Sequence, residues 1–141
     1  MVVQKFGGTS VADPAAIGRL IQIVRTARAR DGRGPAVVVS AMSGVTDTLL
    51  AVASAAGAGR LEDALPRLEQ LRERHLQTAR ALAPRAAAGE LGAALGAQFD
   101  DLVALAKALS VLHEVSPRTL DVVAAAGELE RITGAARGAD L

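Results

Sequence analysis

Residues 2–11 decide the fold, and they read Val-Val-Gln-Lys-Phe-Gly-Gly-Thr-Ser-Val. An apolar run leads into a lysine, two glycines and two hydroxyl residues, and helix-forming sequence follows. This order predicts a short strand over Val2–Lys5 with a cation and exposed backbone N–H groups at its end, where a phosphate can bind. The spacing is not Gly-x-x-x-x-Gly-Lys-[Ser/Thr], because the lysine precedes the glycines. The segment therefore predicts a phosphate site of a different kind.

A strand, a helix and a second strand follow one another within the first 40 residues. Asp13 can cap a helix and Pro14 suits its first position, and apolar residues then recur at helical spacing to about Arg30. A turn over residues 31–35 leads to a continuous apolar run, Ala36–Ser40, which is typical of a strand covered on both faces. Two strands joined through a helix are parallel with a right-handed crossover. We therefore expect an α/β fold.

The rest of the sequence is predominantly helical, and we see no repeats or linkers in it. The first predicted helix stops near Gly57, and an amphipathic helix follows over Leu61–Leu82, in which Pro66 marks a kink or the true start. After a break over Pro84–Gly89, a second amphipathic helix is predicted from Leu91 to Leu109. Ser116 and Pro117 cap the last predicted helix. The two amphipathic helices are expected to form an antiparallel pair. Residues 136–141 resemble a helix end followed by the start of another strand, so the sequence is interpreted as the opening portion of a larger α/β domain.

The composition excludes several classes of function. The 141 residues carry 16 basic and 15 acidic side chains and no cysteine. This balance argues against a nucleic-acid partner, which favours clustered positive charge. The lack of cysteine excludes disulfides and fits a cytoplasmic protein. No signal segment opens the sequence, and no apolar run approaches the roughly 20 residues that span a bilayer, so we expect no membrane partner.

The two histidines and the charged residues of the second half do not form a recognisable site. His75 and His113 have no neighbours at ligand spacing, so we predict that they lie on the surface or at a helix end, and we predict no metal site. The charges over residues 67–74 are interpreted as the solvated face of a helix. No Ser-His-Asp arrangement is present.

Lys5 is the strongest catalytic candidate. It lies at the carboxyl end of a predicted strand, where open parallel sheets bind their ligands. Its ammonium could stabilise charge on a transferring phosphoryl group, although a strand-end lysine can also simply face water. Gly7 and Gly8 favour the first interpretation, because they let the backbone approach a ligand. The hydroxyls of Thr9 and Ser10 could bind phosphate or a hydrated metal ion, or equally could bond the backbone of their own loop.

A second loop rich in hydroxyl groups follows the second strand. Adjacent parallel strands would bring both loops to the same edge of the sheet, so Ser40 and Thr46 are candidates for binding a small polar substrate. Ser43 and Thr46 could instead cap the next helix. Glu128 lies in an apolar stretch and would need a partner if buried, such as a substrate ammonium. By spacing alone, however, a helix glutamate that faces solvent is the simpler interpretation of Glu128.

Three segments together resemble the aspartate kinase family. They are Lys5–Val11 (KFGGTSV), Ser40–Asp47 (SAMSGVTD), and Ser116–Arg118 leading to Gly127–Leu129. They stand in the family's order and at compatible separations. The first segment distinguishes aspartate kinases from other amino-acid kinases, whereas the third is weak on its own.

The resemblance implies transfer of the ATP γ-phosphate to the side-chain carboxylate of L-aspartate, in the biosynthesis of lysine, threonine and methionine. It implies that the segment Lys5–Ser10 (Lys5, Phe6, Gly7, Gly8, Thr9 and Ser10) binds the nucleotide phosphates. It also implies that Ser40, Thr46 and Glu128 bind aspartate, with Glu128 pairing with its ammonium. Mg²⁺ would be bound mainly through ATP.

The implied fold is the N-terminal part of a three-layer αβα amino-acid-kinase fold, with parallel central strands and an inserted helical pair. Residues 1–141 would form a partial catalytic domain without the family's later motifs or its ACT regulatory domains, and the intact protein would be a homo-oligomer. We expect the chain alone to be inactive. One departure is Glu130-Arg131, where the family usually has a small hydroxyl residue.

Two other hypotheses remain open at this point. The chain could be a non-catalytic module that associates with a full-length kinase subunit, since an incomplete sheet leaves an exposed flank. It could also belong to a kinase of the wider superfamily with a different acidic substrate, which the KFGGTSV segment disfavours.

Overall fold

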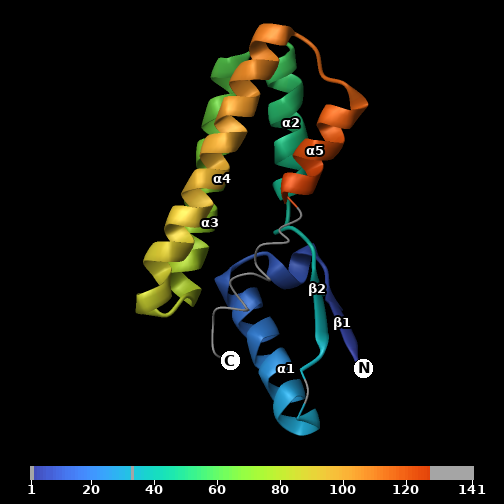
Figure 1. Ribbon diagram of the computed structural model, residues 1–141, viewed down its shortest axis with the longest axis vertical. Helices are drawn as coiled ribbons and strands as arrows, with labels where there is room; N and C mark the ends of the chain where they lie inside the picture. Colours follow the sequence, from blue (N-terminus) through green and yellow to red (C-terminus); the bar gives the residue numbers. More distant parts are fainter. Residues whose placement is uncertain (1, 33, 128–141) are drawn as a thin grey trace. The chain divides into compact units, whose positions relative to one another are not determined.

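A computed structural model describes residues 2–32 and 34–127. It divides the chain into two compact units with a boundary after Gly44. The first unit is an α/β unit, and the second, Val45–Gly127, is helical (Figure 1).

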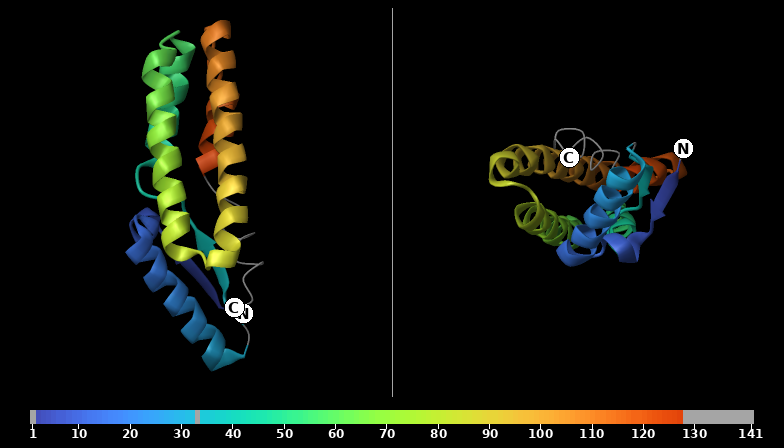
Figure 2. Two further views of the ribbon diagram at one scale, coloured as in Figure 1. Left: turned by 90° about the vertical axis from the view of Figure 1, so that its left-hand side faces the viewer. Right: turned by 90° about the horizontal axis from the view of Figure 1, so that it is seen from below.

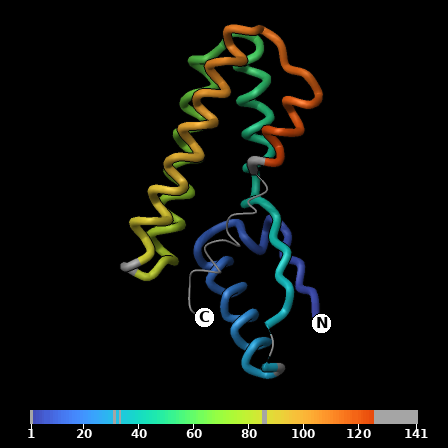
Figure 3. Tube along the Cα trace, viewed as in Figure 1, coloured from blue at the N-terminus to red at the C-terminus, as the bar shows by residue number. Residues whose placement is uncertain are grey.

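The α/β unit has the predicted strand–helix–strand order. Its elements are β1 (Val3–Phe6), the short 3₁₀ helix η1 (Gly8–Val11), α1 (Pro14–Asp31) and β2 (Ala36–Val39). The two strands are parallel and lie side by side (Figure 3), with Val3 opposite Ala36 and Phe6 opposite Val39. The predicted parallel pair is confirmed. The bounds differ slightly from the prediction. Strand β1 lies one residue later than the predicted Val2–Lys5, and β2 ends at Val39 instead of Ser40.

The ends of α1 are fixed by local chemistry. The Asp13 carboxylate accepts a hydrogen bond from the Ala16 N–H at 2.7 Å, and Pro14 occupies the first turn. At the other end, Gly32 has a φ of 64° and donates its N–H to the Arg28 carbonyl at 3.0 Å. A glycine in this left-handed conformation is a common helix terminator. The predicted helix is therefore confirmed at both ends.

The sheet is covered on one face in the described residues, which corrects the prediction for the second strand. Gln4 and Phe6 on β1 and Val37 on β2 are half-buried, whereas Val3 is 59% exposed and Val38 is 48% exposed. Side chains alternate between the faces of a strand, so the exposed residues share one face. A run of valines cannot distinguish a strand covered on one face from one covered on both.

The helical unit contains four helices in chain order, with bounds α2 (Val45–Gly57), α3 (Leu61–Leu82), α4 (Arg85–Leu112) and α5 (Pro117–Gly127). Helices α3 and α4 run antiparallel and lie side by side (Figure 2), as predicted. Apolar side chains of α2, α3 and α4 form the core, which includes the fully buried Leu49 and Leu68. The Ser116 hydroxyl accepts a hydrogen bond from the Thr119 N–H at 3.1 Å, which confirms the predicted cap of α5.

Two details of the helical prediction are corrected. The predicted break over Pro84–Gly89 is much shorter, because α4 already begins at Arg85 with Pro84 at its N-cap. Alanine-rich sequence after Pro84 favours a helix strongly enough to include Gly89. Pro66 does not mark the start of a helix, since α3 begins at Leu61 and contains Pro66. Proline at the sixth position removes only the one backbone hydrogen bond that its missing N–H would donate to the Glu62 carbonyl, and the helix continues through it.

Candidate functional site

The glycine pair joins β1 to a single tight turn. Gly7 is extended, with a φ of −79° and a ψ of 176°, and it precedes η1. Its carbonyl accepts a hydrogen bond from the Ser10 N–H at 2.9 Å, which closes the 3₁₀ turn that carries Thr9 and Ser10. Val11 at the end of this turn is 2% exposed and anchors it in the core of the unit. The lysine, glycines and hydroxyls are therefore positioned by one strand end and one anchored turn.

The structure brings the two predicted loops together at one edge of the sheet. The Ser40 N–H donates to the Phe6 carbonyl at 3.1 Å, just beyond the paired strands. A Cβ added at Gly8 would lie 3.5 Å from the Ala41 carbonyl oxygen and 3.8 Å from the Ser43 Cα. The predicted proximity of the loops is therefore confirmed. The sequence did not predict that the Ala41 carbonyl lies beside Gly8, because every residue has a backbone carbonyl group.

Gly7 lies next to open space. A Cβ added there would meet no atom within 4 Å, and its extended backbone is available to any residue. Neither the packing nor the conformation of the described chain therefore requires glycine at this position. A ligand that approaches the backbone would require it, because a side chain would occupy the ligand's place.

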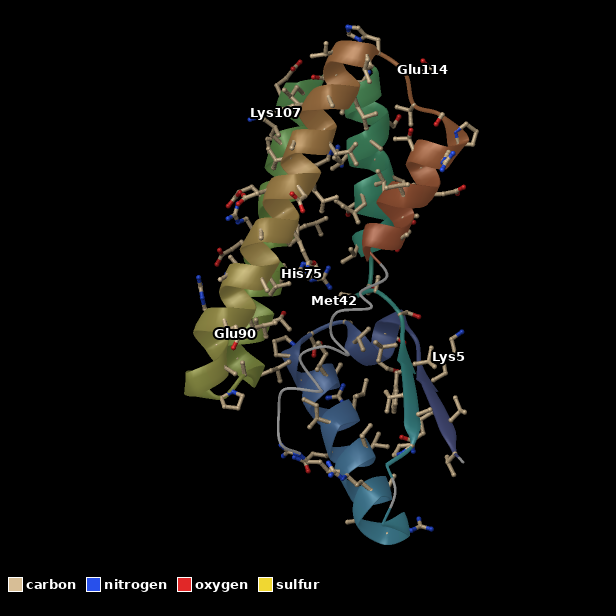
Figure 4. All side chains as sticks on the ribbon, in the orientation of Figure 1. Lys5, Met42, His75, Glu90, Lys107 and Glu114 are labelled. Atoms are coloured by element: carbon tan, nitrogen blue, oxygen red, sulfur yellow. The ribbon has the colours of Figure 1, made fainter. Side chains whose placement is uncertain are left out.

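The Lys5 side chain is exposed, two residues before Gly7. It points away from α1 (Figure 4), on the sheet face that also carries its cross-strand neighbour Val38. Within residues 2–32 and 34–127, no carboxylate forms an ion pair with its ammonium. The cation is therefore available to neutralise an anion that binds at the loop.

The remaining predicted site residues fall into different parts of the chain. Thr9 is exposed on η1, and Ser10 and Ser40 are half-buried in the α/β unit. Thr46 is the second residue of α2 and belongs to the helical unit. Glu128 lies outside the described residues. The structure therefore brings together the phosphate-loop candidates and Ser40, but it does not place Thr46 or Glu128 with them.

His75 is buried, so the prediction of a surface or helix-end position is wrong. Its Nδ1 lies 2.7 Å from the Leu71 carbonyl oxygen and donates to it, and its ring meets Phe99 edge-on with centroids 5.3 Å apart. Burial lowers the pKa of His75, and the Arg74 charge adds to this effect, while the hydrogen bond to Leu71 opposes it. His113 ends α4 and is exposed, as predicted.

The signal for this burial was the helical spacing, because His75 stands seven residues after Leu68 and four after Leu71, which are both buried. Within the described residues, no group of three or more histidines, cysteines or carboxylates could hold a metal ion. No helix in this part of the chain is long and apolar enough to cross a membrane.

Comparison with known proteins connects this arrangement to one family. Residues 1–133 match the model of the amino acid kinase family. Aspartokinase 3, chloroplastic, of Arabidopsis thaliana is 30% identical over 129 residues, which cover 89% of this chain and 21% of the relative. The aspartokinase of Rickettsia conorii is 46% identical over 50 residues, or 36% of this chain and 12% of that protein.

Solved structures give the same result. E. coli aspartokinase III in complex with lysine and aspartate superposes with a TM-score of 0.74 at 27% identity. The same enzyme with aspartate and ADP gives a TM-score of 0.67 at 29% identity. Each match covers 92% of this chain and 26% of the aspartokinase chain, so this chain spans about a quarter of that enzyme.

These matches confirm the predicted fold class, which is part of an amino acid kinase fold with parallel strands and an inserted helical pair. They also agree with the KFGGTSV segment of β1 and η1. The chain therefore belongs to the amino acid kinase family, and its relatives and structural neighbours within that family are aspartokinases.

Proposed function

We propose that this chain supplies the phosphate-binding corner of an aspartate kinase. In the proposed reaction, an oxygen of the aspartate side-chain carboxylate attacks the γ-phosphorus of ATP. The bond between that phosphorus and the β–γ bridging oxygen breaks, and aspartyl-4-phosphate and ADP result. The observation that carries the proposal is the open space at Gly7, which follows the exposed Lys5 by two residues and precedes Gly8, the glycine that contacts the second loop.

The loop fits the phosphates of a nucleotide by charge and by shape. Lys5 provides positive charge where negative charge accumulates on the phosphoryl oxygens during transfer. Gly7 and Gly8 keep the backbone accessible, and the hydroxyl of Thr9 adds a hydrogen-bond donor. When bound with ATP, Mg²⁺ would neutralise further phosphate charge, and the described residues offer no separate metal cluster to hold it.

Aspartate is the acceptor that the relatives favour. The solved E. coli aspartokinase III structures contain aspartate, in one case together with ADP. In this chain, the proposed aspartate ligands are Ser40 beside the phosphate loop and Thr46 at the start of α2. Glu128 would pair with the substrate ammonium. Because the carboxylate of aspartate is itself the nucleophile, positioning and charge stabilisation would supply most of the rate.

The two lysines of the chain make a direct test possible. Backbone ¹⁵N labelling of lysine alone gives one signal from Lys5 and one from Lys107, which is on α4 in the helical unit. Titration with MgADP should shift the Lys5 signal in a saturable way and leave the Lys107 signal unchanged. Lys5→Ala should weaken binding on the order of tenfold or more, as for loss of a charged hydrogen bond.

The controls separate a phosphate site from general electrostatics. Lys107→Ala removes the same charge elsewhere and should leave MgADP affinity unchanged, whereas Lys5→Arg should retain part of it. Equal shifts of both lysine signals, or an unchanged affinity in Lys5→Ala, would contradict the proposed role of the loop. The same titration with L-aspartate and L-glutamate tests the acceptor, because stronger binding of glutamate would favour a different acidic substrate.

A second candidate function is a non-catalytic module that associates with a full-length kinase. The exposed face of the β1–β2 pair, with Val3 and Val38, favours this candidate, since parallel sheets are usually covered on both faces. Size-exclusion chromatography with and without a full-length aspartokinase distinguishes the two. Co-elution that Val38→Lys abolishes would support the module, and separate elution would count against it.

A further inference from the structure

The outer side of α1 carries positive charge without negative charge beside it. Between Pro14 and Arg30 the helix contains no acidic residue, and all of its arginines are exposed, namely Arg19, Arg25, Arg28 and Arg30. Within residues 2–32 and 34–127, neither Arg19 nor Arg25 nor Arg30 forms an ion pair. This side of α1 therefore presents cations that the described part of the chain does not neutralise.

Helix α3 shows the mixed charge that is usual for a helix facing water. Its 22 residues include four arginines and four carboxylates, and the Arg80 guanidinium lies 3.8 Å from the Glu73 carboxylate along the helix. Opposite charges about one turn apart stabilise a helix, whereas like charges at this spacing repel. Arg25 and Arg28 of α1 are three residues apart and form such a like pair. The charge of α1 is therefore not explained by helix stability alone.

The dipole of α1 accounts for only part of this charge. Arg28 and Arg30 lie in the last turn of the helix, where the partial negative charge of the helix end stabilises cations. This effect is confined to the last turn, so it does not extend to Arg19 or Arg25. A partner that supplies negative charge would account for both.

An exposed isoleucine lies among these arginines. Ile23 is 49% exposed, and it follows Arg19 by four residues and precedes Arg30 by seven. Residues at these spacings share one side of an α-helix, so Arg19, Ile23 and Arg30 form a line that we call the α1 strip. At a rise of 1.5 Å per residue, its two arginines are about 16 Å apart along the helix axis. The α1 strip thus has a cation at each end and an apolar side chain between them.

We propose that the α1 strip binds an acidic amphipathic helix of another protein. One carboxylate of that helix pairs with Arg19, an apolar side chain packs on Ile23, and a second carboxylate pairs with Arg30. Because both partners are helices, carboxylates eleven residues apart match the spacing of the two arginines. Arginine suits this contact, since its planar guanidinium can donate two hydrogen bonds to one carboxylate.

The α1 strip fits an acidic helix better than it fits a lipid surface or a nucleic acid. A helix that lies on a membrane buries its apolar side in the lipid. The apolar side of α1 is already used within the α/β unit, where Ala16 is buried and Leu20 is half-buried. Among the described residues of α1, Ile23 is the only large apolar side chain that is exposed. The phosphates of a nucleic acid would neutralise the arginines but would give Ile23 no apolar neighbour.

The proposal is independent of the nucleotide site. The Lys5 side chain points away from α1 (Figure 4). Arg19→Glu should therefore leave the affinity for MgADP unchanged, so failure of one proposal is distinguishable from failure of the other.

Binding of a designed peptide to the full chain tests the α1 strip. The probe is a fluorescently labelled helical peptide of twenty residues, with glutamate at its fourth and fifteenth positions and leucine at its eighth and eleventh. Its other positions are alanine and glutamine, and the two leucines allow the helices to run parallel or antiparallel. Fluorescence anisotropy should show saturable binding to the wild type. Arg19→Glu, Arg30→Glu and Ile23→Ser should each raise the dissociation constant at least about tenfold.

Two controls separate this contact from general attraction between charges. Arg67→Glu makes the same charge change at an exposed arginine of α3 and should leave the dissociation constant unchanged. A peptide of the same composition, with its two glutamates on opposite sides of the helix, should bind the wild type at least about tenfold more weakly. Circular dichroism verifies that every variant remains helical.

Reversing the charges on both partners gives the sharpest readout. The double variant Arg19→Glu/Arg30→Glu should lose the acidic peptide and bind a peptide that has lysine in place of the two glutamates. The wild type should show the opposite preference. A structural role of these arginines within α1 would not produce this exchange.

Several results would overturn the proposal. They are a wild type that does not bind the acidic peptide saturably, an equal loss of binding in Arg67→Glu, and an affinity that Ile23→Ser leaves unchanged. Tighter binding of phosphatidylglycerol vesicles or of polyuridylate, lost in Arg19→Glu/Arg30→Glu, would assign the strip to lipid or to nucleic acid and would also overturn it.

Discussion

At the scale of single residues, the His75 imidazole is buried between α3 and α4 and is kept neutral by its surroundings. Burial is the largest cause of its lowered pKa, and the nearby Arg74 guanidinium also disfavours the protonated ring. The unfolded chain therefore binds this proton more tightly than the folded chain does. By linkage, the stability from neutral His75 is complete above its ordinary pKa of 6.5 and decreases as the pH falls below that value.

This linkage predicts a pH dependence that belongs to one histidine. When the pH is lowered from 7.5 to 5.5, the urea midpoint of the wild type should decrease. This decrease should be larger than the decrease in the urea midpoint of His75→Leu. His113→Gln is the control, because His113 is exposed at the end of α4 and should keep the wild-type pH dependence. Equal pH dependence in His75→Leu and the wild type would show that other groups cause it.

Two glycines of the helical unit should respond to alanine in opposite directions. A Cβ at Gly57 would overlap the Val115 side chain, so Gly57→Ala should destabilise the unit by about 1–3 kcal/mol. Gly89 lies within α4 and a Cβ there meets nothing within 4 Å, so Gly89→Ala should stabilise the unit by about 0.5–1 kcal/mol. Urea unfolding followed by circular dichroism measures both, and effects of the same sign would contradict the packing of Val115.

At the scale of elements, Asp13 caps the N-terminus of α1, the helix that follows the phosphate loop in the chain. Asp13→Ala removes the acceptor for the Ala16 N–H and should lower the free energy of unfolding of the α/β unit by about 1 kcal/mol. Asp13→Asn keeps an acceptor oxygen and should retain most of this stability. Amide hydrogen exchange over the first turn of α1 reports the loss directly, and unchanged exchange in Asp13→Ala would argue against the cap.

The elements that the sequence predicted well are those that local chemistry determines. Asp13 and Pro14 start α1, Gly32 ends it, and Ser116 caps α5, and each of these signals lies within a few residues of its effect. The spacing of His75 with Leu68 and Leu71 indicates its burial, whereas its ring contact with Phe99 was not predictable in this way, because Phe99 is in another helix.

The candidate site was predictable to a similar extent. The parallel strands explain why the first and second loops meet, so the position of Ser40 beside Phe6 followed from the strand–helix–strand pattern. The open space at Gly7 required coordinates, since a sequence does not show what surrounds a glycine. Thr46 belongs to the helical unit and Glu128 lies outside the described residues, so their proposed roles stay predictions.

At the scale of the whole molecule, the chain spans only 26% of the aspartokinase III chain. We therefore expect no aspartate-dependent release of ADP by this chain in a coupled assay with ATP. Lys5→Ala is the control for contaminating kinases, because it should leave any background unchanged. Release that depends on aspartate and disappears in Lys5→Ala would contradict this prediction.

The hydrogen bond from the Ser40 N–H to the Phe6 carbonyl limits where residues can be inserted into this chain or deleted from it. One residue inserted within Ala36–Val39 would shift the pairing by one position and turn every following side chain to the other face of the sheet. The second loop would then move away from Gly8. Insertions in the connection between α1 and β2 would leave this pairing intact. Natural variation in length should therefore accumulate in that connection and be absent from the two strands.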